Sequence, residues 1–233
     1  GERTRDILAR DADGAAMYVG NPNAHSYSNS FVSGELKKAL GLKNIYSAST
    51  VDQMPHMVAN LALFGHSGLW GVPDIDRTET MIILGGNPMA SNGSVWTVPD
   101  FRNRAKALQK RGGQLVVIDP RRTETAKIAD RHLFIRPATD GMLLVALLQA
   151  VLAHPERLTL PDYVDNLEAV ASALAKFDSA DCAAQCGVAL SDIEWLAHRM
   201  VTGPAALYGR MGAATQSFGT LNAWLIALIN IAA

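Results

Sequence analysis

The sequence contains few cysteines and almost no net charge, and each shortage excludes a class of protein. Its 233 residues include two cysteines, Cys182 and Cys186, which are too few for a disulfide-stabilised scaffold. They are also too few for an iron–sulfur cluster, which needs four ligands, so buried and inert thiols are expected. Lys and Arg total 21 against 22 for Asp and Glu, and this balance gives no support for binding to nucleic acid or to a membrane surface.

Long hydrophobic runs are also missing. The most apolar stretch, 219–233, is shorter than a membrane-spanning helix and includes Asn222 and Asn230, so a buried helix is expected there. The first residues show no signal peptide, and a cytoplasmic location is therefore expected, with a periplasmic location of a longer parent left open. The apolar content of 48% and charged content of 18% suit a globular α/β protein with a well-filled core.

Familiar nucleotide-binding and hydrolase motifs are absent from the sequence. It has neither Gly-x-Gly-x-x-Gly between a strand and its helix nor a Walker-type phosphate loop. The Gly-x-Ser-x-Gly elbow is missing as well. A conventional dinucleotide-binding domain is therefore disfavoured, although it stays open as an alternative.

Short apolar runs with turn formers behind them are what the sequence does contain. Runs at 81–84, 115–118, 133–135 and 205–208 are too short for helices, and a helix with a glycine stop is expected at 100–111. Because the strands are apolar throughout, they predict a parallel sheet buried on both faces. The expected fold is α/β: a doubly wound, mainly parallel, Rossmann-like sheet flanked by helices over 48–233. Residues 1–47 are expected to be part of a second α/β domain.

Polar residues follow these strands, at the rim where open α/β sheets bind ligands. Gly86 and Asn87 follow the first run, Asp119 and Arg121 the second, and Asp140 the third. The two carboxylates are able to accept paired donors from a purine edge, and the arginine can clamp phosphate. Each of these residues, taken singly, is equally well an ordinary turn or cap residue.

Smaller features carry weaker predictions. A Gly-Asn-Pro loop at 20–23 suggests a second ligand-facing rim, although turn chemistry explains it as well. His56 and His132 lie outside any recognisable metal motif, so satisfied structural histidines are expected. Ser191 with Glu194 three residues later predicts a capping box for a helix at 192–201.

Four motifs together resemble the large catalytic subunits of the molybdopterin oxidoreductases, the bis-molybdopterin guanine dinucleotide enzymes of the dimethyl-sulfoxide-reductase and formate-dehydrogenase type. Their order and spacing agree over nearly the whole chain. The motifs are Gly-Gly-Asn-Pro at 85–88 with Ser91, Ile-Asp-Pro-Arg-Arg at 118–122, Arg-Pro-Ala-Thr-Asp at 136–140, and Tyr-Gly-Arg-Met-Gly at 208–212 with Gln216.

The resemblance implies roles for individual residues. Gly86, Asn87, Pro88 and Ser91 would lie along the dinucleotide tail of one cofactor. Its guanosine and phosphates would be surrounded by Asp119, Arg121, Thr139 and Asp140, and its pterin side approached by Gly209, Met211, Gly212 and Gln216. The metal would be molybdenum or tungsten.

The resemblance also implies that this chain is an internal fragment of a longer subunit and is inactive alone. A [4Fe-4S] cluster is expected only in a segment that precedes these motifs. The parent would act on a small-molecule substrate of the formate, nitrate or sulfoxide class, together with its remaining domains and an electron-transfer subunit.

One protein side chain ligates the metal in this family, and counting through the step at 44–46 places it at or beside Asp52. A carboxylate is a hard donor suited to a high-valent metal. Ser49 is a rival ligand, and a plain helix cap for the helix that starts near Pro55 is the structural alternative for Asp52.

Two further readings of the whole chain stay open at this point. One is a non-catalytic structural relative in a respiratory complex, in which the strand-end motifs decay. The other is a generic nucleotide-binding Rossmann domain. The intact strand-end motifs favour the enzyme.

Overall fold

The computed structural model describes residues 1–20, 23, 26–158, 160–162 and 164–233. The contacts divide the chain into two compact units, Gly1–Gln53 and Met54–Ala233. The sequence predicted a boundary after Ser47, whereas the contacts divide the chain after Gln53. The predicted ligand-facing loop at 20–23 lies in part outside the described residues.

The first unit is a small βαβ arrangement. Its helices and strands are α1 (Glu2–Arg10), β1 (Ala16–Val19), α2 (Tyr27–Leu40), β2 (Asn44–Ser47) and α3 (Ser49–Asp52). The strands pair in parallel, with Ala16 opposite Asn44 and Val19 opposite Ser47. None of the described residues of this unit is buried, so its sheet has no core of its own.

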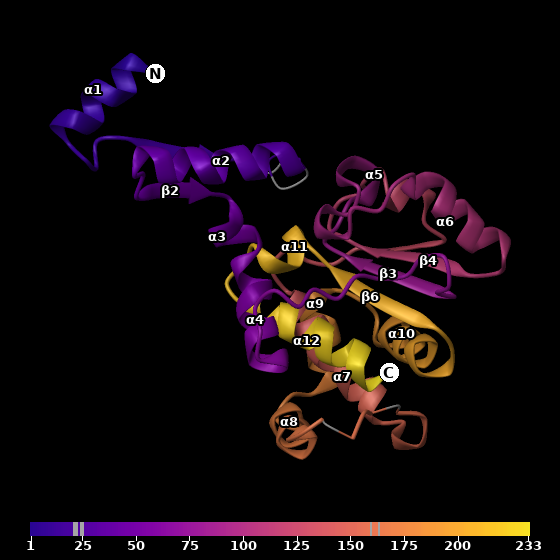
Figure 1. Ribbon diagram of the computed structural model, residues 1–233. Helices are drawn as coiled ribbons and strands as arrows, with labels where there is room; N and C mark the ends of the chain where they lie inside the picture. The colour runs from indigo at the N-terminus through magenta and orange to yellow at the C-terminus, as the bar shows by residue number, and fades with distance from the viewer. Residues whose placement is uncertain (21–22, 24–25, 159, 163) are drawn as a thin grey trace. The chain divides into compact units, whose positions relative to one another are not determined.

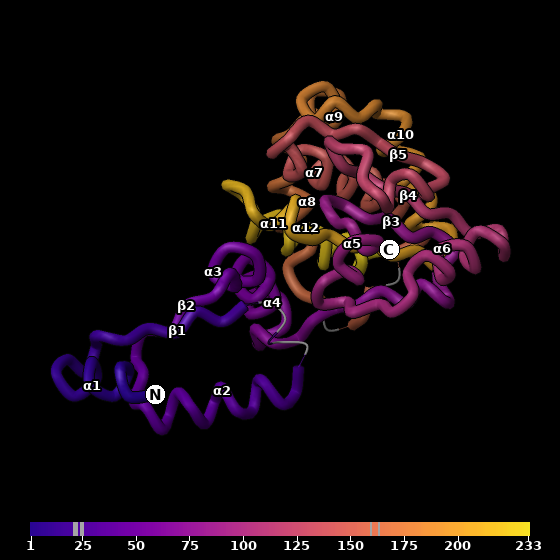
Figure 2. The backbone as a smooth tube through the Cα atoms, turned by 90° about the horizontal axis from the view of Figure 1, so that it is seen from above, coloured from indigo at the N-terminus to yellow at the C-terminus, as the bar shows by residue number. Residues whose placement is uncertain are grey.

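The second unit is built on a four-stranded parallel sheet. Its strands lie in the order β5-β4-β3-β6, with β3 at Thr80–Leu84, β4 at Gln114–Ile118, β5 at Arg131–Leu133 and β6 at Ala205–Gly209. Figure 2 shows β5, β4 and β3 following one another across the sheet. Apolar side chains fill both faces of the two central strands, as the sequence predicted.

Helices cover both faces of this sheet (Figure 1). The helices of this unit are α4 (Met54–Phe64), α5 (Pro88–Ser91), α6 (Phe101–Lys110), α7 (Asp140–Leu152), α8 (Leu167–Leu174), α9 (Ser179–Cys186), α10 (Leu190–Thr202), α11 (Met211–Ala214) and α12 (Gly219–Ala232), with short 3₁₀ turns at Ser94–Trp96, Ala126–Ile128 and Pro155–Arg157.

The core accordingly has two layers. Ile82 and Val116 belong to the layer formed with α7, α9, α10 and α12. Ile83 and Val117 point to the opposite face, where α6 and the aromatic ring of Trp96 cover them. Strand side chains alternate between faces, so a fully apolar strand supplies both layers. The predicted doubly wound α/β sheet is therefore confirmed.

Strand β6 lies at the edge of the described sheet, and α12 satisfies part of its outer edge. The Asn230 side chain on α12 donates to the Leu207 carbonyl at 2.8 Å and accepts from the Leu207 N–H at 2.9 Å. One amide thus replaces the two hydrogen bonds that a neighbouring strand would make with Leu207.

Two local predictions were wrong. The predicted strand at 133–135 instead spans Arg131–Leu133, because the pairing with β4 starts at Arg131 opposite Val116 and Phe134 already turns out to solvent. Helix α10 begins at Leu190 after Ala189, without a side-chain cap, so Ser191 lies inside the helix. The Ala189 carbonyl accepts from Asp192 and Ile193, which closes the first turn before Ser191 could cap it.

Apolar side chains remain exposed on the N-terminal unit and at the start of the last helix. Tyr27 and Phe31 on α2 are 89% and 64% exposed, and Phe218 and Leu221 at the start of α12 are 62% and 46% exposed. In the described part of the chain, no helix is long and apolar enough to cross a membrane.

Candidate functional site

The loops after β3 and β6 meet where the strand order reverses. From β3 the chain moves to β4 and β5 on one side, whereas β6 lies on the other side of β3. Ligands of open α/β sheets bind in the crevice at such a switch point. The four motifs at the carboxyl ends of these strands therefore lie along one rim.

The glycines of this rim let two loops touch. Gly85 has φ of +60°, and a Cβ there would lie 2.8 Å from the Gly212 Cα. The Gly212 N–H donates to the Gly85 carbonyl at 2.9 Å. A Cβ added at Gly86 would also make a close contact, since it would lie 3.1 Å from Ile83 Cγ2. Contacts within the protein therefore favour glycine at these positions.

Asn87 ties the loop after β3 to the loop after β4. Its amide donates to the Glu124 carboxylate at 2.7 Å, and its carbonyl oxygen accepts from the Thr125 hydroxyl at 2.7 Å and from the Thr125 N–H at 3.2 Å. The hydrogen bond from Asn87 holds the pKa of Glu124 below its ordinary value. The side-chain amide of Asn87 thus joins the loops that follow β3 and β4.

Asp140 is the buried carboxylate of the rim. It is 5% exposed and opens α7, where the helix N-terminus favours a negative charge. Gln216 donates to it at 2.7 Å and also to the Gly212 carbonyl at 2.8 Å. Burial raises the pKa of Asp140 above its ordinary value, against the opposing effect of the Gln216 hydrogen bond. Asp140 and Gln216, both predicted site residues, therefore join the motifs after β5 and β6.

Asp119 is the second carboxylate, and it lies half-buried after β4. It accepts the Arg121 N–H at 2.8 Å, so that its loop forms a turn. Its negative charge contributes to the raised pKa of Asp140, which means that the two carboxylates act on one another through space. The two carboxylates that were predicted to surround one guanosine therefore lie within electrostatic reach of one another.

The remaining predicted residues have separate surroundings. Pro88 is buried at the first turn of α5, and the Ser91 hydroxyl donates to the Asn87 carbonyl at 3.2 Å. Thr139 is the residue before α7, but its side chain makes no cap hydrogen bond to the helix. Its hydroxyl donates instead to the Arg136 carbonyl at 2.7 Å. A Cβ added at Gly209 would contact the Ile226 side chain. Met211 is 45% exposed, and the Arg121 side chain extends into solvent.

Asp52, the predicted metal ligand, is the last residue of α3 in the first unit, and it is half-buried. Among the residues that the structure describes, no group of three or more His, Cys, Asp or Glu side chains could hold a metal ion. The resemblance calls for a single protein ligand, so this hypothesis stays a prediction.

Arg210 was not predicted as a site residue, and the prediction for His56 was wrong. Arg210 is 4% exposed, and its Nε and Nη1 atoms are buried without a hydrogen-bond partner. His56 Nε2 is also buried and unpartnered, so the prediction of a satisfied histidine was wrong there. It holds for His132, whose Nε2 lies 2.9 Å from the Asp119 carbonyl oxygen. A charged residue inside a glycine-rich strand end was the one signal that could have revealed Arg210.

The two cysteines match their prediction. Cys182 and Cys186 are both buried and free on α9. Burial raises the pKa of both thiols above the ordinary value, which disfavours the reactive thiolate.

Comparison with known proteins gives several relatives for this chain. It is 25% identical to a nitrate reductase of Klebsiella oxytoca over 89% of the chain, and 28% identical to an assimilatory nitrate reductase of Haloferax mediterranei over 99% of it. It is also 28% identical to the molybdopterin-containing subunit of an arsenate respiratory reductase of Chrysiogenes arsenatis over 55% of the chain. No protein-family model matches. The chain spans 23% and 31% of the length of the two nitrate reductases.

Solved structures agree on the fold. The chain superposes on acetylene hydratase from Pelobacter acetylenicus with a TM-score of 0.78 and 19% identity, over 99% of this chain and 31% of that one. The match therefore includes the parallel sheet and its strand-end loops. Together, these comparisons confirm the recognition of this chain as a relative of the molybdopterin oxidoreductases.

Proposed function

We propose that this chain is part of the cofactor-binding core of a molybdenum or tungsten oxidoreductase, and that its rim holds a molybdopterin guanine dinucleotide. The observation that carries the proposal is the pair of carboxylates at adjacent strand ends, Asp119 after β4 and Asp140 at the start of α7. The names of the relatives support the pterin and the redox class.

The donors and acceptors of the rim fit the guanine end of such a cofactor. Guanine presents N–H donors on one edge, and ionised carboxylates only accept hydrogen bonds. Burial and the negative charge of Asp119 both raise the free energy of the ionised Asp140 carboxylate when no donor is bound to it. A ligand that donates to both would relieve that cost, so the electrostatics favour a donor edge in this place.

The neighbouring groups suit the rest of the dinucleotide. Arg121, two residues after Asp119, is exposed and pairs with Glu124 at 3.8 Å. A phosphate could replace that surface contact, since a guanidinium can bind two oxygens. Gln216, already bonded to Asp140, lies on the side from which the pterin would approach. When bound, the cofactor would supply the metal for two-electron chemistry on a small substrate, whereas the residues named here bind and orient it.

The parent enzyme is proposed to act on a substrate of the formate, nitrate or sulfoxide class and to exchange electrons with a partner subunit. Relatives named as nitrate, arsenate and dimethyl sulfoxide/trimethylamine N-oxide reductases support that range. Asp52 is the proposed protein ligand of the metal. We assign no iron–sulfur ligand to this chain.

The decisive variant is the isosteric double substitution Asp119→Asn with Asp140→Asn in the full-length protein. Each unmet guanine donor should cost about 1–3 kcal/mol, so the purified variant should lose most of its cofactor. GMP released by acid hydrolysis and metal measured by mass spectrometry give the occupancy. Asp181→Asn, at an exposed position on α9, is the matched control and should retain both. Full GMP and metal content in the double variant would refute the guanine role, and a wild-type protein without either would favour the non-catalytic relative.

A further inference from the structure

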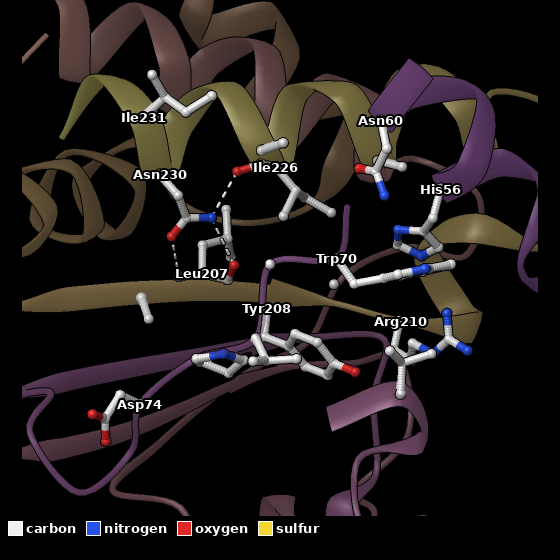
Figure 3. Close-up of a pocket in the computed structure, with 18 of the residues that line it drawn as sticks. His56, Asn60, Trp70, Asp74, Leu207, Tyr208, Arg210, Ile226, Asn230 and Ile231 are labelled. Carbon is white, nitrogen blue, oxygen red and sulfur yellow. Dashed lines mark hydrogen bonds between the residues drawn. The ribbon is translucent and has the colours of Figure 1, made fainter. Parts of the chain in front are cut away.

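A cavity of about 420 Å³ lies alongside the outer edge of β6, within the second unit. Its walls come from β6, from α4 and α12, and from the segment around Trp70 (Figure 3). The volume falls in the range of small-molecule sites in proteins. It is a different place from the rim of Asp119 and Asp140, neither of which lines it.

Arg210 gives this cavity its charge. The residue follows β6, lines the cavity and is 4% exposed. Its Nε and Nη1 atoms are buried without an acceptor, and among the residues the structure describes it forms no ion pair with a carboxylate. A buried guanidinium that lacks both hydrogen-bond acceptors and a counter-charge is unfavourable. A bound anion would supply the acceptors and the negative charge.

His56 and Asn60 from α4 lie at the same end of the cavity as Arg210 (Figure 3). The His56 ring centroid is 5.7 Å from that of Trp70, and its Nε2 atom has no partner. The positive charge of Arg210 acts together with burial to lower the pKa of His56 to about 4. The imidazole is therefore neutral near pH 7, and Arg210 is left as the cation at this end.

The other walls are apolar and aromatic. Trp70 and Tyr208 line the cavity together with Leu207 and Ile226, and the Arg210 guanidinium carbon lies 5.9 Å from the centroid of Trp70. Asp74, the one carboxylate lining the cavity among the described residues, lies at the opposite end in Figure 3. The charge is thus confined to one end, against a flat hydrophobic wall.

We propose that this cavity binds a small, planar, singly charged oxyanion, such as a carboxylate or nitrate, whose two oxygens pair with the Arg210 guanidinium. Planarity follows from the guanidinium, which offers two parallel N–H groups to coplanar oxygens. The proposal does not rest on the proposed function, and neither Asp119 nor Asp140 lines the cavity, although Gly209, which was predicted to approach the pterin, does.

The test is titration of the purified protein with sodium acetate and sodium nitrate at constant ionic strength, followed by calorimetry and by the NMR resonances of the His56 ring. Saturable binding should weaken about tenfold or more in Arg210→Gln, which keeps a polar side chain and removes the charge. Arg102→Gln, at an exposed position on α6, should bind like the wild type. Equal binding by Arg210→Gln and the wild type would overturn the proposal.

A second measurement needs no variant. An anion beside Arg210 should offset its charge, so saturating nitrate, which stays ionised throughout this titration, should raise the pKa of His56 above about 4 in the wild type. A His56 titration that nitrate leaves unchanged would overturn the site even if Arg210→Gln failed to fold. Asp119→Asn with Asp140→Asn should leave acetate binding intact, which separates failure of this site from failure of the rim.

Discussion

His56 should make the second unit lose stability as the pH falls from 6.5 to 4. Burial, and then the charge of Arg210, lower the pKa of this histidine from 6.5 to about 4. Above pH 6.5 the ring is neutral in both the folded and the unfolded chain, so it has no effect on the pH dependence. Between pH 6.5 and 4 only the unfolded chain binds the proton, and stability falls.

The size of this effect follows from the shift. A difference between 6.5 and about 4 corresponds to about 3 kcal/mol, fully lost once the pH is below both values. The ring is mostly enclosed, so solvent reduces this figure little. The other titratable groups that line the same cavity are Asp74, Tyr208 and Arg210.

Urea denaturation at several values between pH 7 and pH 4 measures the effect. All four tryptophans lie within Met54–Ala233, so their fluorescence reports on this unit. His56→Gln should remove the His56 part of the pH dependence, and His198→Gln, at an exposed position on α10, should not. The comparison with each variant cancels the titration of all other groups. Parallel curves for the wild type and His56→Gln from pH 7 to 4 would refute the reasoning.

Two further variants test the packing of the rim and of the aromatic layer. Gly85→Ala should lower the free energy of unfolding by about 2 kcal/mol or more, because the added Cβ would contact the backbone of Gly212. Gly112 also has a positive φ, but a Cβ added there would have nothing within 4 Å. Gly112→Ala should therefore show the effect of backbone strain alone in the same urea titration. Tyr208→Phe should cost about 1 kcal/mol, because it removes the 2.5 Å hydrogen bond to the Gly93 carbonyl and leaves that buried oxygen with the Trp96 N–H at 3.2 Å as its remaining donor among the described residues. Equal losses for the two glycine variants, or a Tyr208→Phe protein as stable as the wild type, would contradict these contacts.

Strong local patterns made the sheet predictable from the sequence. Ile82 and Val116 lie in uninterrupted apolar runs that end in turn formers, and such runs have few alternatives to a buried parallel strand. Asp119 was identified for the same reason, since a polar residue directly after such a strand has a defined place at the rim. Asp140 was identified from the motif that follows the third predicted run and ends at the start of α7. Boundaries were less certain, as β5 shows, because pairing with a neighbour decides where a short strand ends.

The cavity could not be predicted, because its parts come from distant segments. His56 lies in an apolar helix and Arg210 in a loop, and nothing in either segment indicates that the other is near. Unsatisfied hydrogen bonding is a property of the folded environment, so Nε2 of His56 gives no signal in the sequence. The use of Asn87 as a tie between two loops was hidden for the same reason.

The amide of Asn230 has a consequence for how copies of this chain meet. An open strand edge offers its N–H and C=O groups to any extended segment, and such edges promote association between chains. At Leu207 both groups are already occupied by Asn230, so a foreign strand would have to displace a side chain fixed on α12 before it could continue the ladder. Replacing Asn230 by an apolar residue would therefore put solubility at risk, since it would expose an edge on which aggregates can grow.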